Sequence, residues 1–488
     1  MKREDLLSKI SDPSKVWDVV VIGGGATGLG VAVDAVTRGY SVALFEWEDF
    51  AKATSSRSTK LVHGGVRYLA QGDVSLVLEA LYERGLLQQN APHLVKNQSF
   101  LIPNYRYWDN FLYTVGLTIY DILAGRLSLG RSKYVSKKKT TSYLPTVRVD
   151  GLKGGVVYHD GQFDDSRLAV NLAQSCVENG GCPINRMKVT AMLHGSDGRA
   201  RGVKVQDLMN GQEYEVKAKA VINATGIFVD SIMEMDVPTH EHMVKPSQGV
   251  HLVLDKSFLQ SDYAIMIPKT DDGRVLFAVP WHDKVVVGTT DTLREHPELE
   301  PQALESEIEF ILNTAGRYLT RKPQRSDVLS VFAGLRPLAA PKKEGKSTKE
   351  ISRSHKIFVS ENKLITITGG KWTTYRRMAE DTVDKAIELN LLEKKACVTK
   401  KFRIHGYQLN PDLNNHLYIY GSDIQAIKTL MQSDPAMAEK LHPKYDYTVA
   451  EVVWAVREEM ALNVEDILAR RVRLLFLDAR VAAEVGFL

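Results

Sequence analysis

Residues 53–68 bring hydroxyl, imidazole and guanidinium groups into one short stretch of the chain. Hydroxyl groups and backbone amides can surround phosphate groups, and the adjacent Gly64 and Gly65 allow a planar ligand to approach closely. His63 can donate a hydrogen bond or transfer a proton, and Arg67 can bind an anion. Composition alone does not separate a binding segment of this kind from an ordinary loop rich in serine and threonine.

A second candidate is the glycine pattern Gly23-x-Gly25-x-x-Gly28. The early glycines allow a tight turn and a close approach to a pyrophosphate, and Gly28 allows a helix to pack against a strand. The free N–H groups at the start of such a helix attract an anion. Glu46 follows at the position of an acid that binds ribose hydroxyl groups. The pattern therefore indicates a dinucleotide, although glycines that only serve packing are the alternative.

The elements around these glycines strengthen that interpretation. Residues 17–22 are mostly apolar and β-branched, which predicts a buried strand. Residues 29–38 predict a helix rich in small side chains, closed by Gly39. Residues 41–45 predict the next strand. A glycine pattern inside a β-α-β unit is a much more specific signal than the same pattern alone.

The kind of dinucleotide is narrowed by two features. An acid at Glu46 disfavours a 2′-phosphate and therefore NADP, whereas NAD and FAD remain open. Residues 221–226 predict a core strand that ends in a turn of small residues, including Ala224, Thr225 and Gly226. In two-domain flavoproteins such a turn returns the chain to the cofactor, so this segment favours FAD. A buried strand with a glycine at its end is the alternative.

The bulk properties of the 488 residues set outer limits. A chain of this length suits two or three domains. Apolar residues make up 44% and charged residues 25%, and the net charge of +4 gives no reason to expect nucleic acid. Cys176, Cys182 and Cys397 have neither CxxC spacing nor a nearby histidine cluster, so we expect neither a metal site nor a disulfide framework. No apolar run reaches the length of a membrane-spanning helix.

Beyond the first unit, the patterns change twice along the chain. Short strands with turns between them, from residue 251 to 289, predict a mainly antiparallel second domain. After residue 401 the sequence favours helices. The stretch 105–120 is rich in Tyr, Trp and Phe, and the lysines at 137–139 follow it. A membrane interface and an aromatic core with a solvated lysine face are both open interpretations of this stretch.

Taken together, four segments resemble the FAD-dependent, quinone-linked glycerol-3-phosphate dehydrogenases. They are residues 53–68, residues 333–338 (Ala-Gly-Leu-Arg-Pro-Leu), residues 367–376 (Ile-Thr-Gly-Gly-Lys-Trp-Thr-Thr-Tyr-Arg) and residues 467–475. The resemblance implies an α/β FAD-binding domain of the Rossmann-like, p-hydroxybenzoate-hydroxylase/glutathione-reductase type. It further implies an antiparallel β substrate domain and a C-terminal helical cap domain. No D-x-D-x-D-G calcium loop and no large oxidase-type insertion are recognisable, which favours a dehydrogenase.

The resemblance also implies roles for individual residues. Arg336 and Lys371 match positions that bind the substrate phosphate or stabilise the developing carbonyl oxygen. Arg67 and Tyr68 match further substrate positions. His251 matches an active-site histidine that could act as the base, with His63 as its competitor. The residues expected to contact FAD are Gly23, Gly25, Ala26, Thr27, Gly28, Glu46, Thr54, Ser55, Ser58, Thr59, Lys60, Leu61, His63, Val189, Ala224, Thr225, Gly226, Gly334, Gly370, Lys371, Trp372 and Thr373.

The implied reaction is oxidation of sn-glycerol 3-phosphate at C2 to dihydroxyacetone phosphate, with electrons passed through FAD to ubiquinone or menaquinone. It implies a cytoplasmic protein bound peripherally to the cytoplasmic membrane, and it allows a homodimer. An amino-acid oxidase of related fold, a flavin-binding protein without turnover and an NAD-binding regulatory protein are the alternatives. The expected ranges are 17–100, 150–245 and 330–395 for the FAD domain, 101–149 and 246–329 for the substrate domain, and 400–488 for the helical domain.

Overall fold

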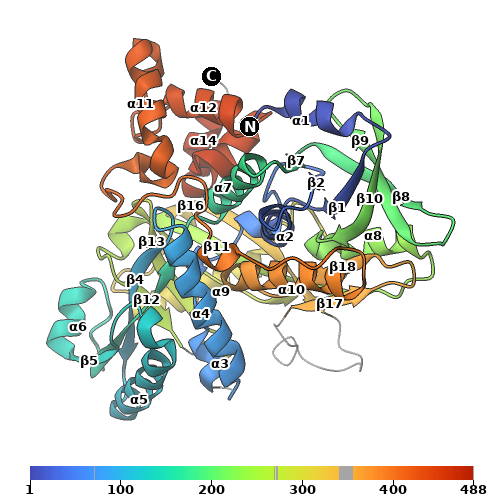
Figure 1. The fold of residues 1–488 in the computed structure, drawn as a ribbon. Coiled ribbons are helices and arrows are strands. Elements are labelled where there is room, and N and C mark those ends of the chain that lie inside the picture. Colours follow the sequence, from blue (N-terminus) through green and yellow to red (C-terminus); the bar gives the residue numbers. More distant parts are fainter. Residues whose placement is uncertain (71, 269, 271–272, 340–354, 487–488) are drawn as a thin grey trace.

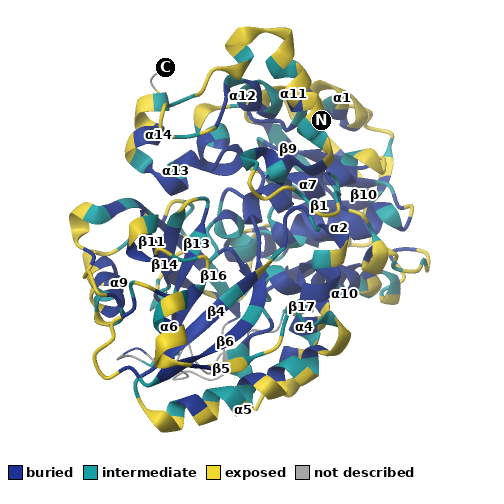
Figure 2. Ribbon diagram, turned by 90° about the vertical axis from the view of Figure 1, so that its left-hand side faces the viewer, coloured by how far each residue is buried: buried dark blue, intermediate teal, exposed yellow. Residues whose placement is uncertain are grey.

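The computed structural model describes residues 1–486 apart from 71, 269, 271–272 and 340–354, and it leaves the side chains of residues 67 and 70 undescribed. Two β-sheets lie side by side, and the C-terminal helices cover one end of both (Figure 1). The interior of each sheet is buried, whereas the exposed residues lie on the outer helices and loops (Figure 2).

The first sheet has a parallel centre that is extended by an antiparallel meander. Its central strand, β1 (Val16–Ile22), is rich in valine and fully buried from residue 19 to residue 22, as expected for a parallel strand covered on both faces. The strand order is β17 (Lys356–Val359), β18 (Ile365–Thr368), β10 (Glu213–Asn223), β1 (Val16–Ile22), β2 (Val42–Phe45) and β7 (Cys182–Ile184), with β8 (Met187–His194) and β9 (Ala200–Asp207) joined to β10.

Small residues let the first helix of this unit pack at short range. Helix α2 (Ala26–Thr37) starts directly after the glycine turn and is buried over most of its length. A β-carbon on Gly30 would lie 2.8 Å from the ring of Tyr375 in α10 (Tyr375–Glu388), so the close contact of α2 and α10 requires glycine there. The other helices around this sheet are α1 (Arg3–Ile10), α7 (Asp165–Glu178) and α8 (Val229–Asp236).

The second sheet is mainly antiparallel, with one parallel pair between β12 and β4. Its longest pairing joins β11 to β16 from residues far apart in the sequence. The strand order is β15 (Thr292–Leu293), β11 (Val244–Asp255), β14 (Lys284–Gly288), β13 (Leu276–Trp281), β12 (Ala264–Ile267), β4 (Lys96–Asn104), β6 (Gly154–Gln162) and β3 (Leu61–Val62), with β16 (Val328–Ala339) on β11 and β5 (Lys133–Ser136) on β6. The helices beside it are α3 (Val66–Ala70), α4 (Val74–Asn90), α5 (Tyr107–Ala124), α6 (Lys137–Tyr143) and α9 (Glu305–Tyr318).

The C-terminal helices are attached by an apolar core and by buried ion pairs. Phe332 of β16 packs in one cluster with Val472 and Phe476. Arg471 donates to both carboxylate oxygens of Asp49, at 2.8 and 3.0 Å, and the arginines beside Asp49 lower the pKa of that buried carboxyl group. This region contains α11 (Ile424–Ser433), α12 (Val449–Glu458), a π-helix (Asp466–Arg471), α13 (Leu474–Leu477) and α14 (Ala479–Gly486).

The boundaries between the two sheets along the chain differ from the boundaries of the domains that we expected from the sequence. Strands β4, β6 and β16 lie wholly or partly in ranges that we assigned to the FAD domain, yet they belong to the second sheet. The expected domain boundaries remain a prediction. A strand can pair within one sheet while the residues at its end line a cavity between the two sheets.

Candidate functional site

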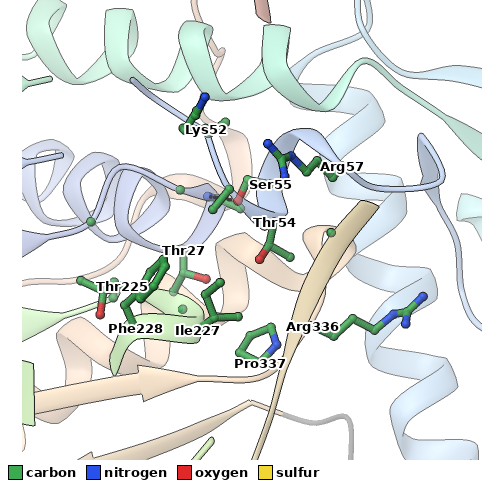
Figure 3. Close-up of a pocket in the computed structure, with 18 of the residues that line it drawn as sticks. Thr27, Lys52, Thr54, Ser55, Arg57, Thr225, Ile227, Phe228, Arg336 and Pro337 are labelled. Carbon is green, nitrogen blue, oxygen red and sulfur yellow. Dashed lines mark hydrogen bonds between the residues drawn. The ribbon is translucent and has the colours of Figure 1, made fainter. Parts of the chain in front are cut away.

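A cavity of about 770 Å³ lies between the two sheets. Its walls come from segments that are distant in sequence, and Figure 3 draws Thr54, Thr225 and Arg336 from three of them in the same close-up. The turns after β1 and β10 line it from the first sheet, and the segment around β3, a strand of the second sheet, lines it from the other side. Residues of β11 and β16 line it from the second sheet.

The glycine turn after β1 is packed so closely that a side chain at Gly23 or Gly28 would clash with the backbone. Gly23 has φ +103°, and a β-carbon there would lie 2.7 Å from the carbonyl oxygen of Ala224. A β-carbon on Gly28 would lie 1.9 Å from the carbonyl oxygen of Gly23. The Gly24 N–H group donates to Glu46 at 2.6 Å, and burial raises the pKa of Glu46 to about 7. This turn is therefore a narrow cradle with an acid at its rim, as a dinucleotide requires.

The start of α2 faces the segment Thr54–Ser56. The Ala26 N–H group donates to the Ser55 hydroxyl at 2.9 Å. The Trp372 indole donates to the Ser55 carbonyl at 2.8 Å, and the Thr54 hydroxyl donates to the Leu335 carbonyl at 2.6 Å. These bonds join both sheets around the helix N-terminus, whose N–H groups can receive an anion.

Most of the residues predicted to contact FAD line this one cavity; the exceptions are Gly28 and Lys60. Gly28 contributes to the turn by its closeness to Gly23. The Lys60 ammonium group donates to Asp165 at 2.7 Å in the protein interior. The size of the cavity, its glycine cradle and the acid Glu46 at one end fit an FAD molecule.

Arg336 is held firmly at the wall of the cavity. Its guanidinium group donates to the carbonyl oxygen of Thr290 at 3.2 Å and to the hydroxyl of Thr289 at 3.1 Å, and Asp291 lies 3.5 Å away. A β-carbon on Gly249 would lie 2.4 Å from this guanidinium, so glycine makes room for it. The fixed position suits a cation that binds a substrate anion rather than a mobile surface charge.

Lys371 lines the same cavity beside Tyr68. Its ammonium group lies 4.0 Å from the centre of the Tyr68 ring, a cation–π contact. Arg67, the fourth residue that we expected at the substrate, has a side chain outside the described part of the structure. The structure thus brings together Arg336, Lys371 and Tyr68.

His251 is the buried histidine of the cavity, with 2% of its surface exposed. Its ring stacks on Phe332, and its Nε2 atom lies 2.9 Å from the Thr59 hydroxyl. Burial first, and then the charges of Arg336 and Lys60, lower the pKa of His251 well below its ordinary value. The imidazole is therefore neutral near pH 7, as a proton acceptor must be.

His63, the competing candidate, also lines the cavity. Its backbone N–H group donates to the Thr373 hydroxyl at 3.2 Å. The structure therefore brings both predicted histidines to the same cavity, on different elements.

Comparisons with known proteins agree with this geometry. Residues 18–376 match the FAD dependent oxidoreductase family, and residues 361–486 match the C-terminal domain of alpha-glycerophosphate oxidase. A glycerol-3-phosphate dehydrogenase, mitochondrial, of Schizosaccharomyces pombe is 40% identical over 99% of this chain and 84% of its own length. A probable glycerol-3-phosphate dehydrogenase, mitochondrial, of Caenorhabditis elegans is 39% identical over 99% of this chain and 71% of its own length. The chain belongs to the FAD-dependent glycerol-3-phosphate dehydrogenase family.

A solved structure of the same family extends the agreement to three dimensions. The glycerol-3-phosphate dehydrogenase from Bacillus halodurans, complexed with FAD, superposes with a TM-score of 0.79 at 30% identity and covers 99% of this chain and 90% of its own. The predicted family, fold class and FAD cofactor are confirmed, and this glycerol-3-phosphate dehydrogenase family member is an FAD-dependent oxidoreductase.

Sequence reasoning missed part of the wall of this dehydrogenase-family site. Lys52 and Arg57 line the cavity, and both pair with Glu300, at 2.7 and 2.5 Å. Arg57 lies within residues 53–68, which we had already selected as a candidate binding segment, so its charge could have indicated that it lines the site. Leu299 lines the cavity and Glu300 beside it pairs with both cations, and neither gave a signal, because they meet these residues only through the fold. Among the described residues no cluster of His, Cys, Asp or Glu could hold a metal ion.

The glycine cradle allows a direct prediction about FAD binding. We expect Gly28→Ala to place a β-carbon against the Gly23 carbonyl and to reduce the FAD content of the purified protein to less than about a tenth. Absorbance of bound flavin per protein measures this. Gly116→Ala is the matched control, because a β-carbon at Gly116 meets nothing within 4 Å. Full FAD content in Gly28→Ala would contradict the proposed packing of this turn.

Proposed function

We propose that this protein oxidises sn-glycerol 3-phosphate at C2 to dihydroxyacetone phosphate. The observation that carries the proposal is the lining of a single cavity, in which Arg336, Lys371 and the neutral His251 meet the glycine cradle. Two cations suit a phosphate dianion, and a buried neutral imidazole suits proton removal from a hydroxyl group. Relatives named glycerol-3-phosphate dehydrogenase support the same substrate.

The protein's own groups supply binding and proton transfer. FAD held along the cradle of Gly23, Gly25 and Gly28 would supply a hydride acceptor, its N5 atom, and a carrier for the electron pair to ubiquinone or menaquinone. Arg336 and Lys371 hold the phosphate group or stabilise the oxygen at C2 as its charge develops. His251 accepts the proton of the C2 hydroxyl group, and its Nδ1 atom has no hydrogen-bond partner among the described residues.

An anaerobic visible spectrum before and after addition of sn-glycerol 3-phosphate tests this proposal. We expect the oxidised flavin bands to bleach on addition of the substrate and to persist with glycine, proline or glycerol. Persistence of the bands with sn-glycerol 3-phosphate would refute the substrate. Bleaching by an amino acid would favour the amino-acid oxidase alternative, and a protein that takes up no FAD would remove the basis of both.

A membrane surface is part of this proposal because the acceptor quinone dissolves in lipid. Helix α5 supports it, since Tyr107, Trp108 and Ile122 are 73%, 70% and 71% exposed. Tyr107 and Trp108 are not core residues, whereas Tyr120 is 1% exposed, so the core interpretation of the stretch 105–120 holds for only part of it. Exposed residues follow the length of α5 in Figure 2, and the lysines of residues 137–139 are exposed nearby. In the described chain no helix is long and apolar enough to cross a membrane.

The apolar side chains of α5 give a measurable expectation. Replacing Trp108, Phe111 and Ile122 together by serine should weaken binding to vesicles of phosphatidylglycerol and phosphatidylethanolamine by at least about tenfold, because each buried apolar side chain contributes about 1.5–3 kcal/mol. Vesicle co-sedimentation measures it. Leu409→Ser with Leu413→Ser is the matched control, since both leucines are exposed elsewhere. Equal binding by the two variants would exclude α5 as the docking surface on the cytoplasmic membrane.

A further inference from the structure

The orientation of His251 depends on its neighbour Thr59. The Thr59 hydroxyl lies 2.9 Å from Nε2 of the imidazole. Phe332 supports the face of the ring, with a centroid distance of 4.9 Å and an interplanar angle of 14°. A stacked ring can still flip by roughly 180° about its Cβ–Cγ bond, which exchanges its nitrogen and carbon positions, so the hydroxyl contact is what selects the direction of its nitrogen atoms.

Thr59 is itself held from both sides by Asp165 of α7. The hydroxyl of Ser58 donates to Asp165 at 2.7 Å, and the ammonium group of Lys60 donates to the same oxygen at 2.7 Å. The Lys60 ammonium also donates to the Ser56 carbonyl at 2.5 Å. Lys60 has a left-handed backbone, φ +63°, which its buried side chain maintains. Both neighbours of Thr59 are therefore tied to one carboxylate.

The same carboxylate is bound by the C-terminal region. Arg473 donates to the second oxygen of Asp165 at 2.9 Å, across 308 positions of sequence. Asp164 lies 3.5 Å from the Arg473 guanidinium, so two acids face two bases in this buried cluster. Burial lowers the pKa of Lys60 to about 7, although Asp165 opposes this shift. An unpaired charge at this depth would be costly, so each member depends on the others.

We propose that Lys60, Asp165 and Arg473 form a positioning unit that holds Thr59 against His251, so that the C-terminal region takes part in orienting the imidazole. None of the three needs to touch substrate; they act through Thr59. The proposal rests on the role proposed above for His251. The Lys60 charge also contributes, with that of Arg336, to lowering the pKa of His251.

A double-mutant cycle on the FAD-loaded protein tests it. We expect Thr59→Val and Lys60→Met each to slow anaerobic flavin reduction by sn-glycerol 3-phosphate about tenfold, and the double variant to be no slower than either single variant. Thr59→Ser, which keeps the hydroxyl group, should recover most of the rate that Thr59→Val loses. Effects that multiply to about a hundredfold would show independent roles and overturn the proposal.

A readout independent of turnover comes from nitrogen-15 NMR of labelled histidines. Below the pKa of Lys60, loss of its charge in Lys60→Met should raise the pKa of His251, and Thr59→Val should shift the Nε2 resonance. An unchanged His251 signal in both variants would overturn the proposal. If Lys60→Met does not fold, the nearly isosteric Asp165→Asn takes its place in the same cycle.

The two proposals fail in different ways. Normal flavin reduction in a His251 variant would refute the base role, whereas the NMR signals would still report whether Lys60 orients the ring. Slow reduction in a His251 variant together with normal reduction in Thr59→Val would refute the positioning unit alone. FAD content, measured for every variant, separates both outcomes from simple loss of the cofactor.

Discussion

Arg336→Ala should reduce the rate of flavin reduction by sn-glycerol 3-phosphate about 10²–10³-fold while FAD stays bound, because a fixed cation near developing negative charge contributes on this scale. The guanidinium group is fixed by Thr289, Thr290 and Asp291. Removing this guanidinium group therefore takes a positive charge from one defined position in the wall of the cavity. Stopped-flow absorbance under anaerobic conditions measures the rate over a range of substrate concentrations.

The dependence of the reduction rate on substrate concentration separates the two roles proposed for Arg336. A weaker apparent binding constant with an unchanged limiting rate indicates a contact with the substrate phosphate, and a lower limiting rate indicates stabilisation of the oxygen at C2. Arg325→Ala is the matched control, since Arg325 is 56% exposed and lies just before the same strand. Unchanged kinetics in Arg336→Ala would remove Arg336 from the site.

The second large effect is expected from His251→Asn, which should slow flavin reduction about 10²–10⁴-fold with little change in substrate binding. A base must be unprotonated to act, and the pKa of His251 is lowered well below its ordinary value. The rate in the unaltered protein should therefore stay constant as the pH falls through the ordinary range of histidine titration. It should decline only in more acidic solution, which stopped-flow measurements over a pH series can follow.

His63→Asn decides between the two histidines. Its backbone N–H group, which donates to Thr373, is unaffected by the substitution, so the local structure should persist. Normal reduction in His251→Asn together with slow reduction in His63→Asn would assign the base to His63. Similar losses in both would indicate that one histidine binds and the other transfers the proton.

The local part of the site was predictable from the sequence. The glycine turn, α2 and β2 are neighbours along the chain, and the requirement for glycine at Gly28 is set by the carbonyl oxygen of Gly23 within the same turn. Short-range patterns of this kind are carried by the residue types themselves. The predicted strand and helix therefore match β1 and α2 within a few residues.

Lys60 illustrates what was not predictable. A lysine in a segment rich in hydroxyl groups suggests a phosphate ligand, and we expected it to contact FAD. Its partner Asp165 is 105 positions away, and the burial of both groups depends on α7 and the C-terminal helices packing over them. The same holds for Glu300, which meets Arg57 only because the second sheet folds over the first. Long-range pairs of charges have no local signature.

The ion pairs between Asp49 and Arg471 join residues that are 422 positions apart. During synthesis the segment after β2 is made early, and its carboxylate has no guanidinium partner until nearly the whole chain has been translated. A buried carboxylate without its partner is costly, so this segment cannot settle beside the cradle before then. The cofactor pocket therefore forms late in the folding of a newly synthesised chain. Translation products that end before Arg471 should not form this pocket.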